Sequence, residues 1–243
     1  PDLAMCADLG MTLQLMQEMM PTPTPQMLLH RDRLVREYRS QVVPSLVRTD
    51  SRAPHDPRLV APVIREAVGQ DAVFCCDIGN HMLFTAQSLA VDSPESFWVS
   101  LGLGGMGSGL GTAIGMQLAY GYLRQVVCMI GDGGLLMCGS ELSTCVRYQI
   151  PLVTVVFDDR RWGMVDDGFQ ALFGRSSPQF QTPQIDFVNY ARSMGLAAVR
   201  IEHLSQVADV IEAHRGQPLL IDMPIDPEIK PANPRVDVLS GDE

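Results

Sequence analysis

Residues 126–134 read Val-Val-Cys-Met-Ile-Gly-Asp-Gly-Gly. The apolar run that opens this stretch is typical of a buried strand, and the glycines and the aspartate end it abruptly. We expect a helix over residues 138–148 and a second buried strand over residues 152–157, which Asp158 and Asp159 follow directly. A strand, a crossover helix and another strand form a unit in which the two strands are parallel.

Parallel strands bring their carboxyl ends to the same edge of a sheet, where open α/β sheets bind their ligands. Asp132 and Asp159, which lie 27 positions apart, should therefore converge at this edge. Two carboxylates beside Gly133 and Gly134, whose backbone N–H groups a ligand can approach closely, suit a divalent cation that holds a phosphate. The alternative for Gly-Asp-Gly alone is a tight turn with a helix-capping aspartate. The pair Asp158-Asp159 at the end of the next strand disfavours this alternative.

Residues 131–165 resemble the cofactor-diphosphate domain of thiamine-diphosphate enzymes, in particular the acetolactate synthase and pyruvate decarboxylase group. The resemblance rests on Gly131-Asp132-Gly133 and on the pair Asp158-Asp159 about 27 residues later. Most members of this group carry Asn-Asn at the position of the pair. The replacement keeps an oxygen ligand at Asp159 and adds negative charge, which either strengthens a metal contact or marks a degenerate site.

The resemblance implies a Mg²⁺ site that the protein and the cofactor share. Side-chain oxygens of Asp132 and Asp159 and the carbonyl oxygen of Arg161 would bind the ion, with two diphosphate oxygens and a water completing an octahedron. Asp158 is either a further ligand or a turn residue. Backbone contacts to the cofactor would come from the glycines of the turn, Gly131, Gly133 and Gly134.

Residues 102–107, Gly-Leu-Gly-Gly-Met-Gly, match GxGxxG between an expected strand and an expected helix. This context makes a nucleotide-binding oxidoreductase the main rival interpretation, which requires an acidic residue at the next strand end. The acid there, Asp132, opens a glycine turn of its own, which disfavours the rival. The resemblance instead implies that the Gly104 carbonyl accepts a hydrogen bond from the 4′-amino group of the cofactor and that Met106 wedges between its two rings. A core position is the alternative for Met106.

Asp77-Ile78-Gly79-Asn80-His81 follows an expected buried strand and opens an expected helix. Free N–H groups at a helix start, a small amide and a histidine can form an anion site. A helix-capping Asn80 is the simpler interpretation of the residues alone. The resembling group has Gly-Gln-His at this place in contact with the diphosphate, so the resemblance assigns Gly79, Asn80 and His81 to that contact.

The segment that follows the aspartate pair also resembles the acetolactate synthases. There, a methionine and a valine at the positions of Met164 and Val165 line the pocket above the thiazolium ring, and a tryptophan shortly after restricts the acceptor. This chain has Gly168 at that position, which indicates a roomier or different acceptor site. Phe169 and Phe173 belong either to the pocket or to the core.

The alternation of expected strands and helices predicts an α/β fold with a doubly wound, mostly parallel sheet and helices on both faces. We expect four segments along the chain: residues 1–20 as the end of a preceding middle domain (strand 2–7, helix 11–20), residues 21–56 as a linker with one helix (26–43), residues 57–225 as the thiamine-diphosphate-binding domain, and residues 226–243 as a tail.

Activation of the cofactor in the resembling group also needs a glutamate from an N-terminal domain, and no residue here matches that domain. The resemblance therefore implies that the chain is a C-terminal portion without the catalytic glutamate. An N-terminal portion or a partner subunit would complete the site in a homo- or hetero-oligomer, a dimer or a tetramer. The implied reaction is decarboxylation of a 2-oxo acid such as pyruvate with carboligation to an acceptor, and FAD in the missing middle domain is an open possibility. A non-catalytic subunit is the third interpretation.

Composition excludes several other classes. The net charge of −10 argues against nucleic acid or an anionic membrane as the main partner. We find no apolar run of the ~18 residues that a membrane span needs, and no signal peptide. The six cysteines show no CxxC pairing, which favours reduced thiols in a cytoplasmic protein. Lys230 is the only lysine, which disfavours a P-loop and Schiff-base chemistry.

Overall fold

The computed structural model describes residues 6–42, 52–91, 93 and 95–232 of the 243-residue chain. The chain divides into two compact units, residues 1–41 and 42–243. The expected helices over residues 11–20 and 26–43 are present as α1 (Leu9–Met19) and α2 (Pro25–Val42). Residues 6–8 carry no strand, and the rest of the expected strand 2–7 lies outside the described residues.

Helix α1 starts at a polar cap and buries none of its residues. The side chain of Asp8 accepts a hydrogen bond from the Met11 N–H at 2.9 Å, which satisfies one of the free donors at the helix start. Apolar side chains such as Leu9 and Met19 stay exposed. The described residues of the first unit therefore contribute little buried core.

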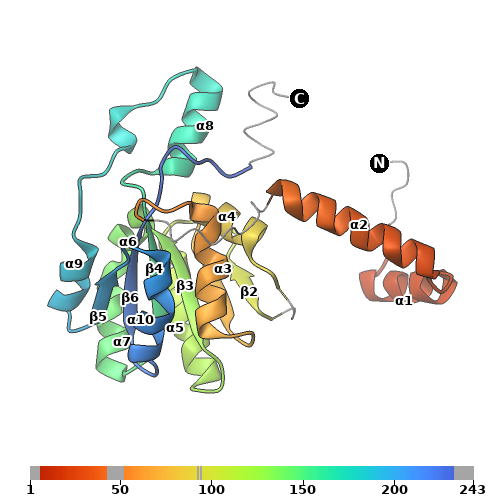
Figure 1. Cartoon of the computed structure of the whole chain (residues 1–243), viewed down its shortest axis with the longest axis horizontal. Helices are drawn as coiled ribbons and strands as arrows, with labels where there is room; N and C mark the ends of the chain where they lie inside the picture. Colours follow the sequence, from red (N-terminus) through yellow and green to blue (C-terminus); the bar gives the residue numbers. More distant parts are fainter. Residues whose placement is uncertain (1–5, 43–51, 92, 94, 233–243) are drawn as a thin grey trace. The chain divides into compact units, whose positions relative to one another are not determined.

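The second unit is built on one six-stranded sheet in which every pair of neighbouring strands is parallel (Figure 1). The strand order is β2-β1-β3-β4-β6-β5. The strands are β1 (Val73–Cys76), β2 (Phe97–Val99), β3 (Val126–Gly131), β4 (Val153–Asp158), β5 (Ala197–Arg200) and β6 (Leu219–Pro224). The predicted doubly wound parallel sheet is thereby confirmed.

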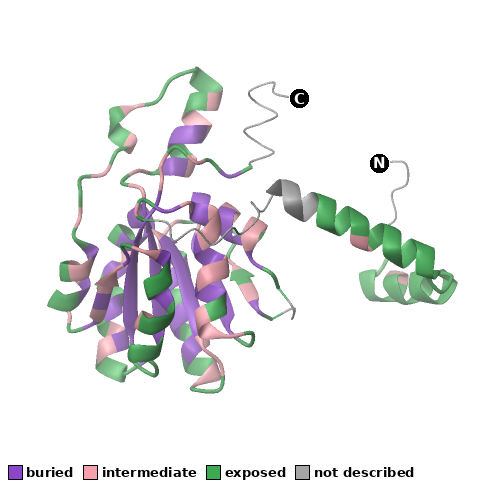
Figure 2. Cartoon of the chain, in the orientation of Figure 1, coloured by how far each residue is buried: buried purple, intermediate pink, exposed green. Residues whose placement is uncertain are grey.

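Helices cover both faces of this sheet, and each face has its own buried cluster. One cluster involves α3 (Pro57–Val68) and α10 (Val207–Ala213), with α4 (Asn80–Ser88) packed on α3. The other involves α5 (Ser108–Tyr120), α6 (Asp132–Cys138), α7 (Leu142–Tyr148) and α9 (Phe187–Ser193). Figure 2 shows the central strands buried along their length, which explains why they read as continuous apolar runs.

Alternation along each strand divides its side chains between the two clusters. Phe74 and Cys76 enter the cluster under α3 and α10, whereas Val73 and Cys75 enter the other. The sheet is therefore packed on both faces, so the carboxyl ends of its strands form a rigid edge.

Two helices differ from the expectation. The helix predicted over residues 138–148 already begins at Asp132, as α6, and continues through a 3₁₀ turn (Gly139–Glu141) into α7. Helix α8 (Gly163–Phe173) was not expected, because glycine has low helix propensity and two glycines lie within it. It ends at Gly174, whose φ of 67° is the left-handed conformation common after helices.

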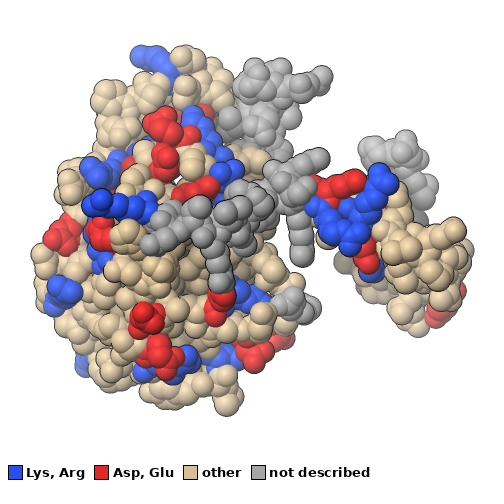
Figure 3. All heavy atoms as spheres, in the orientation of Figure 1, with Lys and Arg blue, Asp and Glu red and all other residues tan. Residues whose placement is uncertain are grey.

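Further features of the described residues bear on the cysteines, on the membrane and on the surface charge. All six cysteines are free, and burial raises the pKa of the Cys75 thiol to about 12. Among the described residues, no helix is long and apolar enough to cross a membrane. Figure 3 shows acidic and basic side chains interspersed over the visible face of this unit. Residues 226–232 form no helix or strand, and the rest of the expected tail lies outside the described residues.

Candidate functional site

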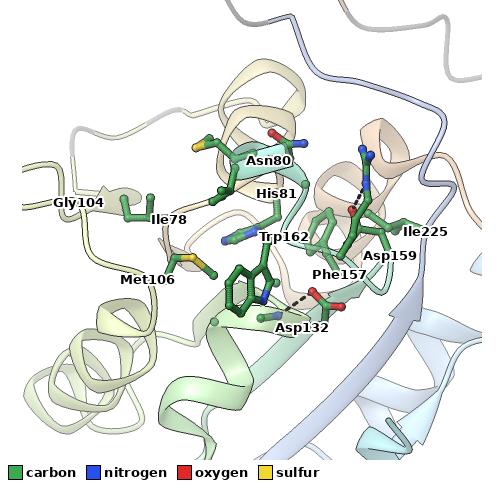
Figure 4. Close-up of a pocket in the computed structure, with 18 residues that line it drawn as sticks. Ile78, Asn80, His81, Gly104, Met106, Asp132, Phe157, Asp159, Trp162 and Ile225 are labelled. Atoms are coloured by element: carbon green, nitrogen blue, oxygen red, sulfur yellow. Dashed lines mark hydrogen bonds and ion pairs between the residues drawn. The ribbon is translucent and has the colours of Figure 1, made fainter. Parts of the chain in front are cut away.

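A cavity of about 270 Å³ lies at the carboxyl ends of β1, β3 and β4 (Figure 4). Every residue that the sequence analysis assigns to the cofactor or the metal lines this cavity: Gly79, Asn80, His81, Gly104, Met106, Gly131, Asp132, Gly133, Gly134, Asp159, Arg161 and Met164. Ile78, Phe157, Trp162, Gly163, Val165 and Ile225 complete the lining. Five segments far apart in the sequence therefore meet at the predicted edge of the sheet.

Two carboxylates line this cavity: that of Asp132, which is buried, and that of Asp159, which is partly buried. Asp132 opens α6 and is 3% exposed, and Asp159 directly follows β4. Asp132 accepts a hydrogen bond from the Gly133 N–H at 2.6 Å and one from the Thr182 hydroxyl at 3.1 Å. Burial, and then the charge of Asp159, raises the pKa of Asp132 to about 7. Burial also raises the pKa of Asp159 to about 6, against the opposing effect of the Arg161 guanidinium.

The raised pKa values mean that ionising Asp132 and Asp159 is unfavourable here, because two negative charges would lie close together with little water to solvate them. A divalent cation between the two carboxylates would relieve the repulsion. Among the described residues, no group of three or more His, Cys, Asp or Glu side chains could hold a metal alone. Two carboxylates that line one cavity, Asp132 and Asp159, fit an ion such as Mg²⁺, which protein carboxylates commonly share with a phosphate ligand and water.

The aspartate pair at the end of β4 is divided between two surroundings. Asp159 lines the cavity and lies 3.4 Å from Arg161 Nε. Asp158 is not part of the lining: its Oδ2 lies 3.2 Å from Arg200 Nη1, and the same arginine also pairs with Asp222 on β6. Each aspartate of the pair thus lies beside a different arginine, and each of these arginines also pairs with other carboxylates.

The glycine turn at the start of α6 has no room for side chains. A Cβ on Gly133 would lie 2.6 Å from the Trp162 ring, and one on Gly134 would overlap Asp77 Oδ2. A Cβ on Gly131 would lie 3.0 Å from His81 Nδ1. Because the first N–H groups of a helix have no intrahelical acceptor, this bare turn presents donors to an anion in the cavity.

His81 is the one lining side chain with an unpaired buried polar atom. It is 5% exposed, and its Nε2 has no hydrogen-bond partner among the described residues. Burial lowers the pKa of His81 to about 4, so the imidazole is neutral, and its ring lies 5.8 Å from that of Phe157. Buried polar atoms in folded proteins are almost always paired. The orphaned nitrogen therefore indicates that a polar ligand belongs in this cavity.

Asn80 lines the cavity but uses its side-chain amide within the protein. Its Nδ2 donates a hydrogen bond to Asp167 Oδ2 at 2.8 Å. What it offers to an anion is its place as the first residue of α4, where backbone N–H groups are free. Asn80 does not cap α4 with its side chain either, since the cap residue is Gly79.

Sequence reasoning gave no role to Asp77, which does not line the cavity but packs against Gly134, which does. Its side chain is fully buried and accepts hydrogen bonds from the Gly107 N–H at 2.8 Å and the Gly109 N–H at 2.9 Å. It thereby ties the loop that carries Gly104 and Met106 to the end of β1. The sequence does carry a signal for Asp77: it is an acid that directly follows a buried strand and lies two positions before Gly79.

Met106 is half-buried and lines the cavity, so the core alternative for it is wrong. Its Cε lies 3.1 Å from the position that a Cβ on Gly133 would take, and Figure 4 shows it beside Trp162. Met164 and Val165 also line the cavity. Gly168 does not, and a Cβ added to it would meet nothing within 4 Å.

The two phenylalanines of α8 lie outside the lining. Phe169 packs on Phe173 at a centroid distance of 4.6 Å and on Phe180 at 5.3 Å. Phe173 is 61% exposed, so it belongs to neither the pocket nor the buried core. These phenylalanines therefore pack on one another and not against Gly168, beside which the structure has open space.

Known proteins resemble this chain in sequence. The sequence pattern of the family described as thiamine pyrophosphate enzyme, C-terminal TPP binding domain, matches residues 77–223. The acetolactate synthase of Bacillus subtilis is 32% identical over 193 residues, which are 78% of this chain and 33% of that protein. The acetolactate synthase isozyme 2 large subunit of Escherichia coli is 37% identical over 159 residues, which are 64% of this chain and 29% of that protein.

The fold also has solved counterparts. The benzoylformate decarboxylase of Polynucleobacter necessarius superposes with a TM-score of 0.71 at 22% identity, over 78% of this chain and 36% of that chain. The chain spans no more than about a third of the length of the curated relatives it matches. Because the family pattern covers more than half of the residues, from Asp77 to Met223, this chain belongs to the thiamine pyrophosphate enzymes and contains their C-terminal cofactor-binding domain.

Proposed function

We propose that this chain binds thiamine diphosphate through Mg²⁺ and forms the diphosphate-binding part of an enzyme that decarboxylates a 2-oxo acid. The observation that carries the proposal is the convergence of Asp132, Asp159 and the unpaired His81 in one glycine-lined cavity. The matched family binds this cofactor, and the cavity offers what a metal-bound diphosphate needs. Those needs are carboxylate oxygens for the ion and backbone donors for the phosphates.

The roles follow from the positions of the residues. Asp132 and Asp159 would hold Mg²⁺ by their side chains, and Arg161 by its carbonyl oxygen. The starts of α4 and α6 would donate backbone N–H groups to the diphosphate, and His81 would meet it from the floor of the cavity. Gly104 and Met106 lie on the loop that Asp77 holds, from which they would position the ring portion of the cofactor.

The reaction class follows from the cofactor and from the relatives. When bound, thiamine diphosphate supplies a nucleophilic carbon and an electron sink for the decarboxylation of 2-oxo acids. The relatives named acetolactate synthase favour carboligation of a pyruvate-like donor to an acceptor. Gly168, which stands where the synthases have a tryptophan, lies outside the cavity lining, so this cavity lends no support to a different acceptor. Phe157 and Val165 would help to exclude water around the reacting atoms.

A further part of the protein or a partner subunit would complete the site. The chain contains no counterpart of the glutamate that activates the cofactor in the resembling group. The second unit also exposes several large apolar side chains on and around α5 and α6: Leu101, Leu103, Leu118, Tyr122, Leu123, Leu136 and Met137. Exposed apolar side chains mark an interface where they gather into one contiguous patch. FAD, proposed for the middle domain, would lie outside this chain's cavity.

Titration calorimetry with thiamine diphosphate, in the presence and absence of Mg²⁺, tests the proposal. We expect binding that requires Mg²⁺ and is abolished by EDTA. Binding of NAD in place of thiamine diphosphate would support an oxidoreductase, and binding of neither would support a non-catalytic subunit. A second assay measures release of CO₂ from pyruvate. Robust turnover by this chain alone would contradict the need for a second part.

A further inference from the structure

The carboxylate of Asp167 joins three segments around the cavity. It lies in the first turns of α8, and its side chain is 8% exposed. Its Oδ2 accepts the hydrogen bond from Asn80 Nδ2 at 2.8 Å. Its Oδ1 lies 3.1 Å from Lys230 Nζ and 3.6 Å from Arg161 Nη2. One side chain thus contacts the start of α4, the loop after β4 and the C-terminal segment.

The two oxygens of Asp167 are held in different ways. Oδ2 has a well-formed hydrogen bond, whereas Oδ1 is buried without one and depends on the charges of Lys230 and Arg161. A buried carboxylate is stable only when such charges or hydrogen bonds compensate for its lost hydration. The acceptor function and the charge of Asp167 therefore act on different neighbours, and substitutions can separate them.

Arg161 links the carboxylate of Asp167 to the metal site, because its guanidinium also contacts Asp159. Its guanidinium is 12% exposed and reaches three carboxylates: Asp159 at 3.4 Å, Asp166 at 3.6 Å and Asp167 at 3.6 Å. A planar guanidinium that is held on several sides keeps a fixed orientation. Without the charge of Asp167, Arg161 would be free to pair more closely with Asp159 and compete there with a cation.

Lys230 connects the C-terminal segment to the same carboxylate. This segment starts at Ile225, which lines the cavity, and the Ala232 carbonyl accepts a hydrogen bond from Gln87 of α4 at 2.7 Å. Lys230 also lies 3.5 Å from Gln170 of α8. Asp167 therefore lies where α4, α8 and the C-terminal segment meet.

We propose that Asp167 is a positioning residue of the diphosphate and metal site. It fixes the start of α4 through Asn80, and it keeps Arg161 in the orientation that leaves Asp159 available to the metal. It does not line the cavity, so it acts through these neighbours alone. This inference rests on the proposed binding of thiamine diphosphate and Mg²⁺ and names a residue that such binding requires.

Two substitutions separate the roles. Asp167→Asn removes the charge and keeps an acceptor for Asn80, whereas Asp167→Ala removes both. We expect the Kd for thiamine diphosphate in Mg²⁺ to rise at least tenfold in both variants, which corresponds to about 1.4 kcal/mol. We expect backbone hydrogen exchange in the first turn of α4 to accelerate only in Asp167→Ala. Asp209→Asn and Asp209→Ala are the matched controls, since Asp209 is an exposed acid on α10.

The single lysine provides a readout that needs no cofactor. Acetylation of Lys230, followed by peptide mass spectrometry, should be faster in both Asp167 variants than in the parent chain. Unchanged Kd values in Asp167→Asn would overturn the positioning role. Accelerated exchange throughout the sheet in both variants would also overturn it, since that result indicates general destabilisation.

The experiments distinguish a wrong proposal for Asp167 from a wrong proposal for cofactor binding. If the parent chain binds no thiamine diphosphate, the proposed function is wrong, and the exchange and acetylation measurements decide the role of Asp167. Faster acetylation in both variants with faster α4 exchange in Asp167→Ala alone would support the positioning of α4 and the C-terminal segment. No change in either measurement would overturn it.

Discussion

Arg200 Nη1, at the end of β5, lies 3.2 Å from Asp158 Oδ2, at the end of β4. Asp159 is the next residue, yet it faces the cavity and pairs with Arg161. Successive side chains of a strand point to opposite faces, so one aspartate of the pair holds the sheet while the other reaches the site. Position 158 therefore lies outside the cavity lining and beside Arg200, although its charge, after burial, still contributes to the raised pKa of Asp132 and of Asp159.

This division predicts different outcomes for the two aspartates. Asp158→Asn should change the Kd for thiamine diphosphate in Mg²⁺ by less than about threefold, because Asp158 does not line the cavity. Asp159→Ala should weaken binding by about 100-fold, since loss of a metal ligand typically costs several kcal/mol. Calorimetry at saturating Mg²⁺ measures both. A large loss in Asp158→Asn would show that this residue is a ligand after all.

Asp132 should oppose folding when no metal is bound. Its pKa is raised to about 7 from an ordinary value of 3.8, so the folded chain binds this proton more tightly than the unfolded chain does. The stability that this bound proton gives the folded chain is fully present below the unfolded pKa of 3.8, and it is lost as the pH rises through the folded pKa of about 7. Near pH 8, Asp132→Asn should therefore raise the free energy of unfolding of the metal-free chain by ~2 kcal/mol.

Urea unfolding at pH 4 and pH 8 in EDTA measures this effect. The gain in Asp132→Asn should appear at pH 8 and largely vanish at pH 4, where the Asp132 carboxyl is protonated in the folded chain and partly protonated in the unfolded chain. The same variant should lose binding that depends on Mg²⁺, so stability and function would change in opposite directions. Equal stability of the two proteins at pH 8 would contradict the interpretation of a strained carboxylate.

Asp77 should matter for both stability and binding. In Asp77→Asn, the new amide can accept a hydrogen bond from only one of the Gly107 and Gly109 N–H groups, and its own NH₂ meets the other donor. We expect a loss of ~1–3 kcal/mol in unfolding free energy, because a buried donor is left unpaired. Binding of thiamine diphosphate should also weaken, since the loop with Gly104 and Met106 loses its anchor. Asp209→Asn is the control for loss of an acidic charge.

The sequence predicted the sheet and the cavity more completely than it predicted the helices and the ion pairs. Buried parallel strands read as apolar runs, and a glycine turn after a strand marks the sheet edge, so Asp132 and Asp159 could be placed together. Helix α8 was missed because Gly163 and Gly168 weaken its local signal. Tertiary packing decided that helix, and local sequence carries little information about packing.

The partners of charged side chains were beyond sequence reasoning for a related reason. Arg200 and Asp158 lie 42 positions apart, and Asp77 and Gly107 lie 30 apart. Nothing in the spacing of such pairs distinguishes them from other acids and donors, because only the strand order brings them together. The sequence could therefore name Asp158 as an anomaly, and only the structure could show that it pairs with Arg200.

The glycine turn provides a direct test of the close packing behind the cavity. A methyl group on Gly134 would overlap Asp77 Oδ2 and lie 3.1 Å from Ile130 Cγ1. Neither neighbour can move away, because Asp77 is fixed by two hydrogen bonds and Ile130 is fully buried. Gly134→Ala should therefore lower the free energy of unfolding by ~1–3 kcal/mol through overpacking.

Gly111 is the matched control for this substitution. It also lies within a helix, α5, but a Cβ there would meet nothing within 4 Å. Gly111→Ala should be neutral or stabilise the chain by ~0.5–1 kcal/mol, because alanine favours helices over glycine. Urea unfolding of the two variants, followed by calorimetry with thiamine diphosphate and Mg²⁺, compares them. Equal effects of the two substitutions would mean that the turn can relax, and the cavity floor would then be less rigid than its contacts with Asp77 imply.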